Sequence, residues 1–297
     1  MPADDPWRGG GALHVAVIGT GLMGSQIAAE YAAAGHYVTV THSSRTPAAE
    51  ALTRIEGLGP IPHGQVRMAT TTPEAAAEAD LIVEALPESL EIKQHELREA
   101  QTTTPSAILC TSTSSLRVSD IATALDDPTR LVGTHYLNPL FAFDVVELVH
   151  SAKSDAAVVG HVERILIELG RRPIRVADVS GFVINRLQFS LLREAISLVD
   201  SGVISAEDLD VLMREGLGAR WSAAGPFEVV SLGGPALFTT LAQRIFPTLN
   251  NQVFPPDSLD RHRIASNRIE ELRQTIMDRL FKWAGARSEP NRVSKSV

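Results

Sequence analysis

The chain has 297 residues, of which 44% are hydrophobic and 21% are charged, and its formal net charge is −8. This length and apolar fraction are sufficient for two domains that each bury a core. The acidic balance, with no basic stripe to offset it, argues against nucleic acid or an anionic membrane as a partner.

Cysteine content and hydropathy narrow the class of protein further. Cys110 is the only cysteine, so an internal disulfide and a cysteine-based metal cluster are excluded, and we expect a cytoplasmic protein with no metal site. No apolar run approaches the ~18 residues that span a bilayer, and residues 1–11 have no signal-peptide core.

The first predicted elements are an apolar strand over 13–19 and an Ala-rich helix from Ser25 to Ala34, which Gly35 stops. The turn between them has the G-x-G-x-x-G pattern, with the residues Gly19, Thr20, Gly21, Leu22, Met23 and Gly24. In such a turn the first glycine permits the sharp bend and the second lets the main chain approach a pyrophosphate, while the third lets the helix pack on the strand. Glycine turns also occur for structural reasons alone, but this context predicts a dinucleotide site.

The second predicted strand, 37–41, ends where an NAD-binding chain usually presents a carboxylate to the ribose, about 20 residues beyond the glycines. No carboxylate stands there. The strand is followed by His42, Ser43, Ser44 and Arg45. Hydroxyls and a guanidinium suit a 2′-phosphate, which a carboxylate would repel, so we expect NADP rather than NAD, with Ser43 and Arg45 as contacts. The alternative is that these residues form an ordinary polar loop.

Strands and helices alternate along the first half of the chain. The expected strands are 13–19, 37–41, 66–69, 81–85, 107–111 and 131–135, and helical stretches include 73–79 and 90–100. This alternation predicts an α/β domain with a doubly wound parallel sheet, in which ligands bind at the carboxyl ends of the strands.

From about Val179 the pattern becomes helical only. We predict helices over 181–200, over 205–216 with Ser205 as the cap, and over about 257–283. We therefore place a Rossmann dinucleotide-binding domain at 12–178 and an all-α substrate domain at 179–287. Residues 1–11 and 288–297 are expected to be flexible tails.

Five segments follow one another in an order that resembles the 3-hydroxyacyl-CoA dehydrogenase family. They are the residues 84–88, 112–116, 135–139, 181–187 and 225–228. The resemblance extends from Leu13 to beyond Leu232. It implies an NAD(P)-dependent oxidoreductase that acts on a CH–OH donor, interconverting a 3-hydroxy and a 3-oxo group of a small molecule. It also implies that the helical domain forms a homodimer.

The chemistry of such a reaction requires a base for the hydroxyl proton. His135, at a strand end, suits this role because its ordinary pKa lies near 6.5. Taken alone, a histidine at a strand end is more often structural. Glu147, in the strand-like run 144–149, matches the family's partner that orients the ring, and the spacing between the two residues is preserved.

Other residues match the family's polar positions. The resemblance implies that Ser114 and Asn185 lie near the substrate oxygen, that Asn138 lies near substrate and nicotinamide, and that Glu88 and Lys93 lie near the nicotinamide ribose. Simpler roles remain open: Asn138 begins a turn with Pro139, residues 112–115 cap a helix, and Glu88 and Lys93 pair with each other.

The connection over 43–65 departs from the acyl-CoA-using members, which have a long charged helical excursion there. In this chain it is short and broken by Gly and Pro, so we expect no helical pair to hold CoA. The segment 216–221 is similar to relatives that use smaller hydroxy acids, such as gulonate and carnitine dehydrogenases and the lambda-crystallins. Arg220 or Arg186 could then bind a substrate anion.

The lambda-crystallins also supply an alternative function, because they illustrate a non-catalytic cofactor-binding protein kept for structural or sensing use. The complete acid–base pair and its accessory polar residues favour the enzyme, since a purely structural role requires none of them.

Overall fold

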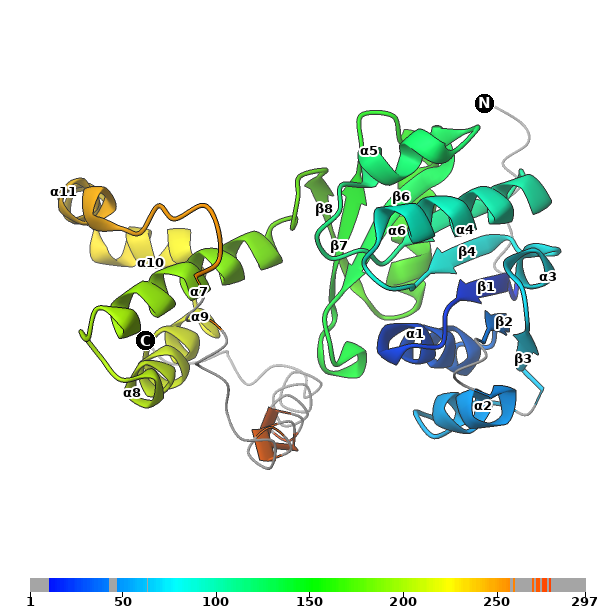
Figure 1. Ribbon diagram of the computed structural model, residues 1–297, viewed down its shortest axis with the longest axis horizontal. Coiled ribbons are helices and arrows are strands. Elements are labelled where there is room, and N and C mark those ends of the chain that lie inside the picture. Colours follow the sequence, from blue (N-terminus) through cyan, green and yellow to red (C-terminus); the bar gives the residue numbers. More distant parts are fainter. Residues whose placement is uncertain are drawn as a thin grey trace, which may run out of the picture. The chain divides into compact units, whose positions relative to one another are not determined.

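The computed structural model describes residues 11–42, 47–62 and 64–256, together with 259, 269, 271–272, 274–276 and 278. The chain forms two compact units. The boundary between them lies between Asn185 and Arg186, and the second unit extends to Leu272. Each unit is described by itself (Figure 1).

Eight strands of the first unit form one sheet in the order β3-β2-β1-β4-β5-β6-β7-β8. They are β1 (His14–Ile18), β2 (Tyr37–Thr41), β3 (Val66–Ala69), β4 (Leu81–Glu84), β5 (Ile108–Thr111), β6 (Leu131–Tyr136), β7 (Val145–His150) and β8 (Arg172–Ala177). Strands β1 to β6 are parallel to one another, as the sequence predicts, whereas β7 is antiparallel to β6 and parallel to β8.

The doubly wound parallel sheet that the sequence predicts is present in β1 to β6, and the antiparallel direction of β7 is an addition that the sequence did not predict. Only residues 137–144 join β6 to β7, with the short 3₁₀ helix η3 (Leu140–Ala142) among them. A parallel crossover needs a dozen or more residues, so a connection of this length forces the chain to turn back. The edge strand β8 was not predicted, because Arg172 and Arg175 interrupt its apolar pattern.

Helices cover both faces of the sheet (Figure 1). One face packs against α1 (Leu22–Ala33), α2 (Ala48–Glu56) and α6 (Ala156–Glu168), and the other against α3 (Thr72–Ala76), α4 (Leu90–Thr103) and α5 (Val118–Ile121). The two short 3₁₀ helices η1 (Ala122–Ala124) and η2 (Pro128–Arg130) follow α5. Strand β1 shows why both faces are apolar: Val15 and Val17 enter the first core, and Ala16 and Ile18 enter the second.

The first helix begins at Leu22, three residues before the predicted start, because Gly21 is its N-cap in an extended conformation. Its end agrees with the prediction, since Gly35 has a φ of +90° and its amide donates to the carbonyl of Ala32. The glycine turn therefore leads directly into the first helical turn, whose free amides face the carboxyl ends of the strands.

The second unit is helical. Helix α7 (Ile184–Asp200) begins in the first unit and continues into the second, where it is followed by α8 (Ala206–Val211), the π-helix η4 (Leu212–Gly218), α9 (Ala219–Trp221), α10 (Pro226–Gly233), α11 (Pro235–Ile245) and the 3₁₀ helix η5 (Phe246–Thr248). Ser205 caps α8 as predicted, accepting from the amide of Asp208 (3.1 Å). The predicted helix over 257–283 falls almost wholly outside the described residues.

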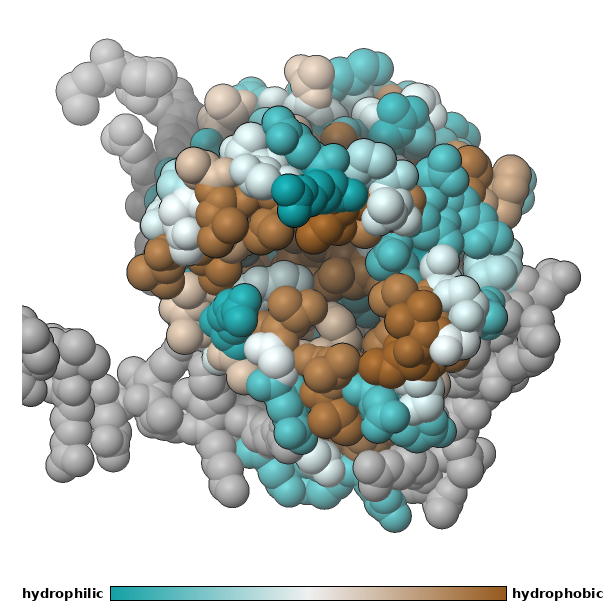
Figure 2. Space-filling view, turned by 90° about the vertical axis from the view of Figure 1, so that its left-hand side faces the viewer, coloured by the Kyte–Doolittle hydropathy of each residue, from teal (hydrophilic) through white to brown (hydrophobic). Residues whose placement is uncertain are grey.

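The second unit exposes many large apolar side chains. Among its described residues only Ile196 is buried, whereas Phe227 is 87% exposed and Leu232 is 83% exposed. Figure 2 faces this unit and shows apolar side chains gathered in patches on its surface.

Candidate active site

The glycine turn between β1 and α1 is shaped by close contacts. Gly19 has a φ of +111°, and a Cβ atom there would lie 2.8 Å from the carbonyl oxygen of Ala85. A Cβ atom on Gly24 would lie 2.0 Å from the carbonyl oxygen of Gly19, so only glycine permits this packing. Gly21 is different, because nothing lies within 4 Å of its Cβ position. The main chain at Gly21 therefore borders open space of the kind that an approaching pyrophosphate needs.

A cleft of about 1150 Å³ opens beside this turn, at the carboxyl ends of the parallel strands. Residues that line it include Gly21, Leu22, Met23, Thr41, Glu88 and Ser114. Its position is the one at which sheets of this topology bind ligands, and the residues present fit a dinucleotide.

The described end of β2 carries no carboxylate. Thr41 instead accepts a hydrogen bond from the amide of Gly19 (2.8 Å), which ties the strand end to the glycine turn. Arg54 reaches from α2 to a carbonyl of the same turn (3.2 Å) and lines the cleft. Ser43 and Arg45, the expected cofactor contacts, lie outside the described residues.

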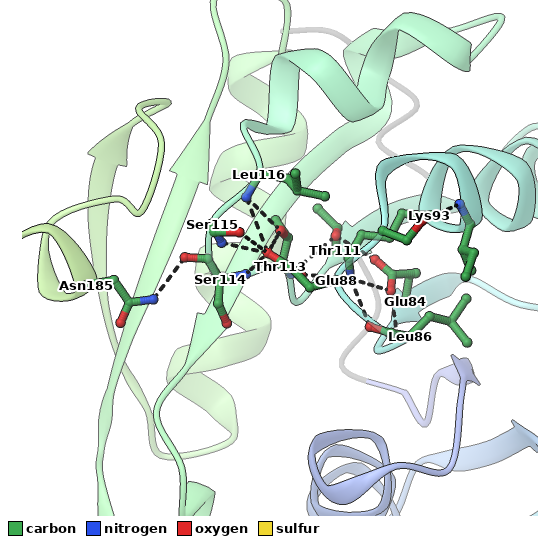
Figure 3. Close-up of polar contacts among 12 residues, drawn as sticks. Glu84, Leu86, Glu88, Lys93, Thr111, Thr113, Ser114, Ser115, Leu116 and Asn185 are labelled. Carbon is green, nitrogen blue, oxygen red and sulfur yellow. Dashed lines mark hydrogen bonds and ion pairs between the residues drawn. The ribbon is translucent and has the colours of Figure 1, made fainter. Parts of the chain in front are cut away.

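Lys93 forms a buried ion pair at the end of β4. Its Nζ lies 2.8 Å from Oε1 of Glu84 and 3.5 Å from Oε2 of Glu88, and only 1% of the residue is exposed. Glu84 is also buried and accepts from the amide of Leu86 and the hydroxyl of Thr111, both at 2.6 Å (Figure 3). These hydrogen bonds satisfy the buried charges, so the pair fixes the strand end. No sequence pattern indicates that Glu84 lies nearer to Lys93 than Glu88 does.

Glu88 accepts several hydrogen bonds from the loop that follows β5 (Figure 3). Its Oε1 accepts from the hydroxyl of Thr113 (2.7 Å) and from the amide (2.7 Å) and hydroxyl (2.8 Å) of Ser115. The amides of Ser114 (3.0 Å) and Leu116 (3.3 Å) point at the same oxygen. The side chain thus organises the segment that carries Ser114, in addition to lining the cleft.

The charge state of Glu88 follows from these contacts. Burial by itself would raise the pKa, but the hydrogen bonds from Thr113 and Ser115 and the charge of Lys93 outweigh it and lower the pKa of Glu88 to about 2. Glu88 is therefore ionised throughout the neutral range.

His135 and Glu147 lie directly opposite each other on β6 and β7. Side chains of an opposed antiparallel pair emerge on the same face, and here Nδ1 of His135 is 2.7 Å from Oε2 of Glu147. Both residues are buried. An ionised carboxylate only accepts hydrogen bonds, so we assign the ring proton to Nδ1, which leaves the lone pair on Nε2. The pair can therefore accept a proton at Nε2.

Glu147 is fixed from a second direction by the start of α7. Its Oε1 accepts from the amides of Val183 (2.9 Å) and Ile184 (3.1 Å). Burial would raise the pKa of Glu147, but the hydrogen bonds from His135 and these two amides outweigh it and hold the pKa below its ordinary value. Before these amides Phe182 has a φ of +50°, and its buried ring contacts His135 at a centroid distance of 5.3 Å. This left-handed residue is a feature that no sequence pattern identified.

Ser114 and Asn185 are brought together although 71 positions separate them. The side-chain amide of Asn185 donates to the carbonyl oxygen of Ser114 (2.9 Å), as Figure 3 shows. The hydroxyl of Ser180 donates to the carbonyl of Ser115 (2.8 Å), and both carboxylate oxygens of Asp178 accept from amides at the start of α5. The loop after β5 is thereby joined to the segment that leads into α7.

Asn138 lies in the turn after β6 and is exposed. Its Oδ1 accepts from Nε2 of Gln26 on α1 (3.3 Å), and the amide of Leu140 donates to Oε1 of Gln26 (2.7 Å). No sequence pattern identifies Gln26, because a polar residue in an Ala-rich helix gives no signal of a partner 112 positions away. Within the described part of the chain, no cluster of three or more His, Cys, Asp or Glu side chains could hold a metal. Among the described helices, none is long and apolar enough to cross a membrane.

Comparison with known proteins identifies relatives over most of the chain. The sequence profile for the NAD-binding domain of 3-hydroxyacyl-CoA dehydrogenase matches residues 14–179, and the profile for its C-terminal domain matches 181–275. The L-carnitine dehydrogenase of Streptomyces griseus is 32% identical over 236 residues, which cover 74% of this chain and 70% of the relative. A 5-formyl-3-hydroxy-2-methylpyridine 4-carboxylate 5-dehydrogenase of Mesorhizobium japonicum is 29% identical, covering 80% of this chain and 82% of the relative.

Solved structures show the same architecture. The crystal structure of a 5-formyl-3-hydroxy-2-methylpyridine 4-carboxylic acid 5-dehydrogenase, described as an NAD⁺-dependent dismutase, has a TM-score of 0.80 at 25% identity and covers 93% of this chain and 98% of that one. A 3-hydroxyacyl-CoA dehydrogenase from Archaeoglobus fulgidus has a TM-score of 0.69 at 29% identity, with 92% and 99% covered.

The lowered pKa of Glu88 predicts a pH-dependent contribution to stability. The ionised group stabilises the folded state above its ordinary pKa of 4.5, and this contribution is lost as the pH falls toward about 2. We expect Glu88→Gln to lower the free energy of unfolding at neutral pH, and its difference from wild type to shrink through this window. Urea unfolding at several pH values measures the difference. Glu91→Gln, at an exposed position of α4, is the control, and an equal loss for Glu88→Gln at every pH would contradict the assignment.

Proposed function

The chain belongs to the 3-hydroxyacyl-CoA dehydrogenase family, and we propose that it is an NAD(P)-dependent dehydrogenase that interconverts a 3-hydroxy and a 3-oxo group by His/Glu acid–base catalysis. The observation that carries the proposal is the buried pair of His135 and Glu147, joined at 2.7 Å with Nδ1 committed to the carboxylate. Because Nδ1 donates to the carboxylate, the lone pair on Nε2 can accept a proton from a substrate hydroxyl.

The chain's own residues provide the proton chemistry and the positioning. The bound dinucleotide supplies the hydride acceptor for alcohol oxidation and the hydride donor for ketone reduction. In the oxidative direction Nε2 of His135 takes the hydroxyl proton, and Glu147 stabilises the imidazolium that results. In the reductive direction the same nitrogen returns the proton to the carbonyl oxygen. Glu147 stays ionised in both directions, because the hydrogen bonds from His135 and from the two main-chain amides hold its pKa below the ordinary value.

Three further side chains complete the proposed substrate site. Ser114 and Asn185 are held together by their own hydrogen bond, and we assign them to the oxygen side of the substrate. Asn138, beside the histidine strand, is assigned to substrate and nicotinamide. Glu88 lines the cleft and contacts the nicotinamide ribose in this proposal, whereas Lys93 acts by holding Glu84 and Glu88 in place.

The alternative function, a non-catalytic cofactor-binding protein of the lambda-crystallin type, has less support. Such a role needs the glycine turn and the cleft only. The named relatives at about 30% identity are dehydrogenases, and the contact of His135 with Glu147 supports the proposed acid–base pair.

The first test is removal of the base. Because general acid–base catalysis contributes roughly 10²–10⁴-fold, His135→Ala should reduce kcat by that order and leave the dissociation constant for the dinucleotide nearly unchanged. Glu147→Gln should also slow turnover. His161→Ala, at a buried histidine on α6, is the matched control and should retain activity in proportion to the folded fraction. Near-normal turnover of His135→Ala would remove this residue from the mechanism.

A preference for NADP within this cofactor class remains a prediction from the residues after β2. Its support is the lack of a carboxylate at the described strand end and the presence of Arg54 in the cleft. Ser43 and Arg45 are the proposed 2′-phosphate contacts. The structural relative described as NAD⁺-dependent favours NAD instead.

Removal of the Arg45 guanidinium tests that preference. A charge-assisted hydrogen bond contributes about 1.5–3 kcal/mol, so Arg45→Ala should weaken NADPH binding roughly ten- to a hundredfold and leave NADH binding nearly unchanged. Dissociation constants for both cofactors measure the effect. Arg175→Ala is the control, because it removes a positive charge on β8 that is paired with Glu163 of α6. Equal losses for both cofactors, or a wild-type preference for NADH, would refute the assignment.

We also propose that the substrate is smaller than an acyl-CoA. In the described part of the connection between β2 and β3, α2 is the only helix, so no helical pair is available there to hold the adenine and phosphates of CoA.

A substrate comparison tests this proposal. We expect a free 3-oxo acid to show a kcat/KM at least equal to that of acetoacetyl-CoA at one pH, because recognition comes from groups near the reacting carbon. Free CoA should be a poor competitive inhibitor. A clear preference for the thioester, with tight competition by free CoA, would show that another part of the chain provides a CoA handle.

Two further proposals concern the molecule as a whole. The exposed apolar side chains on α10 and α11 support a homodimer formed through the helical unit, because burying them in a second copy removes them from water. A cytoplasmic location is proposed from the single, buried cysteine.

A further inference from the structure

Gln26 is a buried polar residue that joins α1 to the turn after β6. Only 4% of it is exposed, two positions after the last glycine of the glycine turn. Its Nε2 donates to the carbonyl of Leu22 (3.2 Å) and to Oδ1 of Asn138 (3.3 Å), and its Oε1 accepts from the amide of Leu140 (2.7 Å). The side chain therefore uses both of its donors and its oxygen in a single arrangement.

Main-chain groups fix the orientation of this amide, because each of them has one polarity. The amide of Leu140 can only donate, so the atom of Gln26 that faces it must be Oε1. The carbonyl of Leu22 can only accept, so the NH₂ group must be on the opposite side. The same NH₂ group faces Asn138, which must in turn present Oδ1 to it. The polarity of two main-chain groups is thus transmitted through Gln26 to the side chain of Asn138.

The consequence is that Nδ2 of Asn138 is directed away from Gln26. Within the described part of the chain this NH₂ group has no hydrogen-bond partner, and Asn138 is exposed at the end of the strand that carries His135. We propose that Gln26 is a positioning residue, which locks the Asn138 amide so that the site offers a hydrogen-bond donor to an acceptor oxygen of the bound reactants. This inference rests on the proposed dehydrogenase function, and it assigns a role to a residue outside the catalytic set.

The main chain of the turn has a separate anchor. Arg171 pairs with Glu30, one helical turn beyond Gln26, and donates to the carbonyls of Leu140 (3.1 Å) and Phe143 (2.8 Å). The turn is therefore held on α1 at two points. Loss of the Gln26 amide should release the Asn138 side chain while Arg171 continues to hold the main chain.

A double-mutant cycle tests whether Gln26 acts through Asn138. We expect Gln26→Met to lower kcat/KM about fivefold, the value of one oriented hydrogen bond, and Asn138→Ala to lower it by at least as much. The double variant should be no slower than Asn138→Ala alone. If Gln26→Met causes the same fold-loss in the Asn138→Ala background, the proposal is overturned.

Gln101 provides a matched control for the loss of a buried glutamine. It is 5% exposed on α4 and clamps another turn, accepting from the amides of Asp126 (2.9 Å) and Asp127 (3.1 Å) and donating to the carbonyl of Asp127 (2.9 Å). Gln101→Met should lower the Tm without changing kcat/KM. If Gln101→Met reduces kcat/KM as much as Gln26→Met does, the effect is one of stability and the proposal is wrong.

Two further measurements complete the test. The first identifies which reactant carries the acceptor oxygen, and the second tests the role of Gln26 independently of the proposed enzyme activity. If Nδ2 serves the substrate, Gln26→Met leaves the dinucleotide dissociation constant unchanged; if it serves the nicotinamide carboxamide, that constant rises by a similar factor. The side-chain NH₂ signal of Asn138 in a ¹⁵N correlation spectrum, assigned by its loss in Asn138→Ala, needs no activity. It should shift in Gln26→Met and not in Gln101→Met, and an unchanged signal in both would overturn the proposal even if no substrate is turned over.

Discussion

The buried carboxylate of Glu147 is the group on which the arrangement of the site depends. A carboxylate removed from water is tolerated only when its oxygens are satisfied, and here one oxygen receives the ring N–H of His135 while the other receives the amides of Val183 and Ile184. These partners belong to β6 and to the start of α7. A single side chain on β7 therefore fixes the tautomer of the histidine and the entry of the helix that leads to the second unit.

Carboxylates that accept hydrogen bonds from neighbouring elements are also found at the end of β4. Glu84 is held by Lys93 and by groups from β5, and Glu88 collects the hydroxyls and amides of the loop after β5. Each carboxylate replaces the hydration that it loses with donors from a neighbouring strand end. Loops at the carboxyl edge of a parallel sheet have few hydrogen-bond partners of their own, so carboxylates that accept several hydrogen bonds from them give them a defined shape. These hydrogen bonds favour the ionised carboxylates and therefore lower the pKa values of Glu88 and Glu147.

The turn after β6 is positioned by amide and guanidinium groups instead. Gln26 and Glu30 lie one turn apart on α1, so both side chains emerge on the same side of the helix and reach the same turn, the second through Arg171. The helix that follows the glycine turn thus contributes to the proposed cofactor site at its start and to the proposed substrate site one turn later. This arrangement relates the positions of dinucleotide and reactant through one rigid element, which hydride transfer between them requires.

The sequence by itself determined the features that depend on local chemistry. Apolar runs and their spacing predicted strands β1 to β6, the glycine spacing predicted the turn into α1, and the order of five segments predicted the family. The tertiary structure decided features that depend on partners far apart in the chain: the reversal of β7, the left-handed Phe182 beside His135, the pairing of Lys93 with Glu84 and the contact of Gln26 with Asn138. Local patterns report which residues are buried and where the chain turns, because these follow from side-chain hydrophobicity and backbone sterics. They do not report which buried polar group satisfies another, because that choice is made by the packing of strands and helices that the sequence separates by tens of positions.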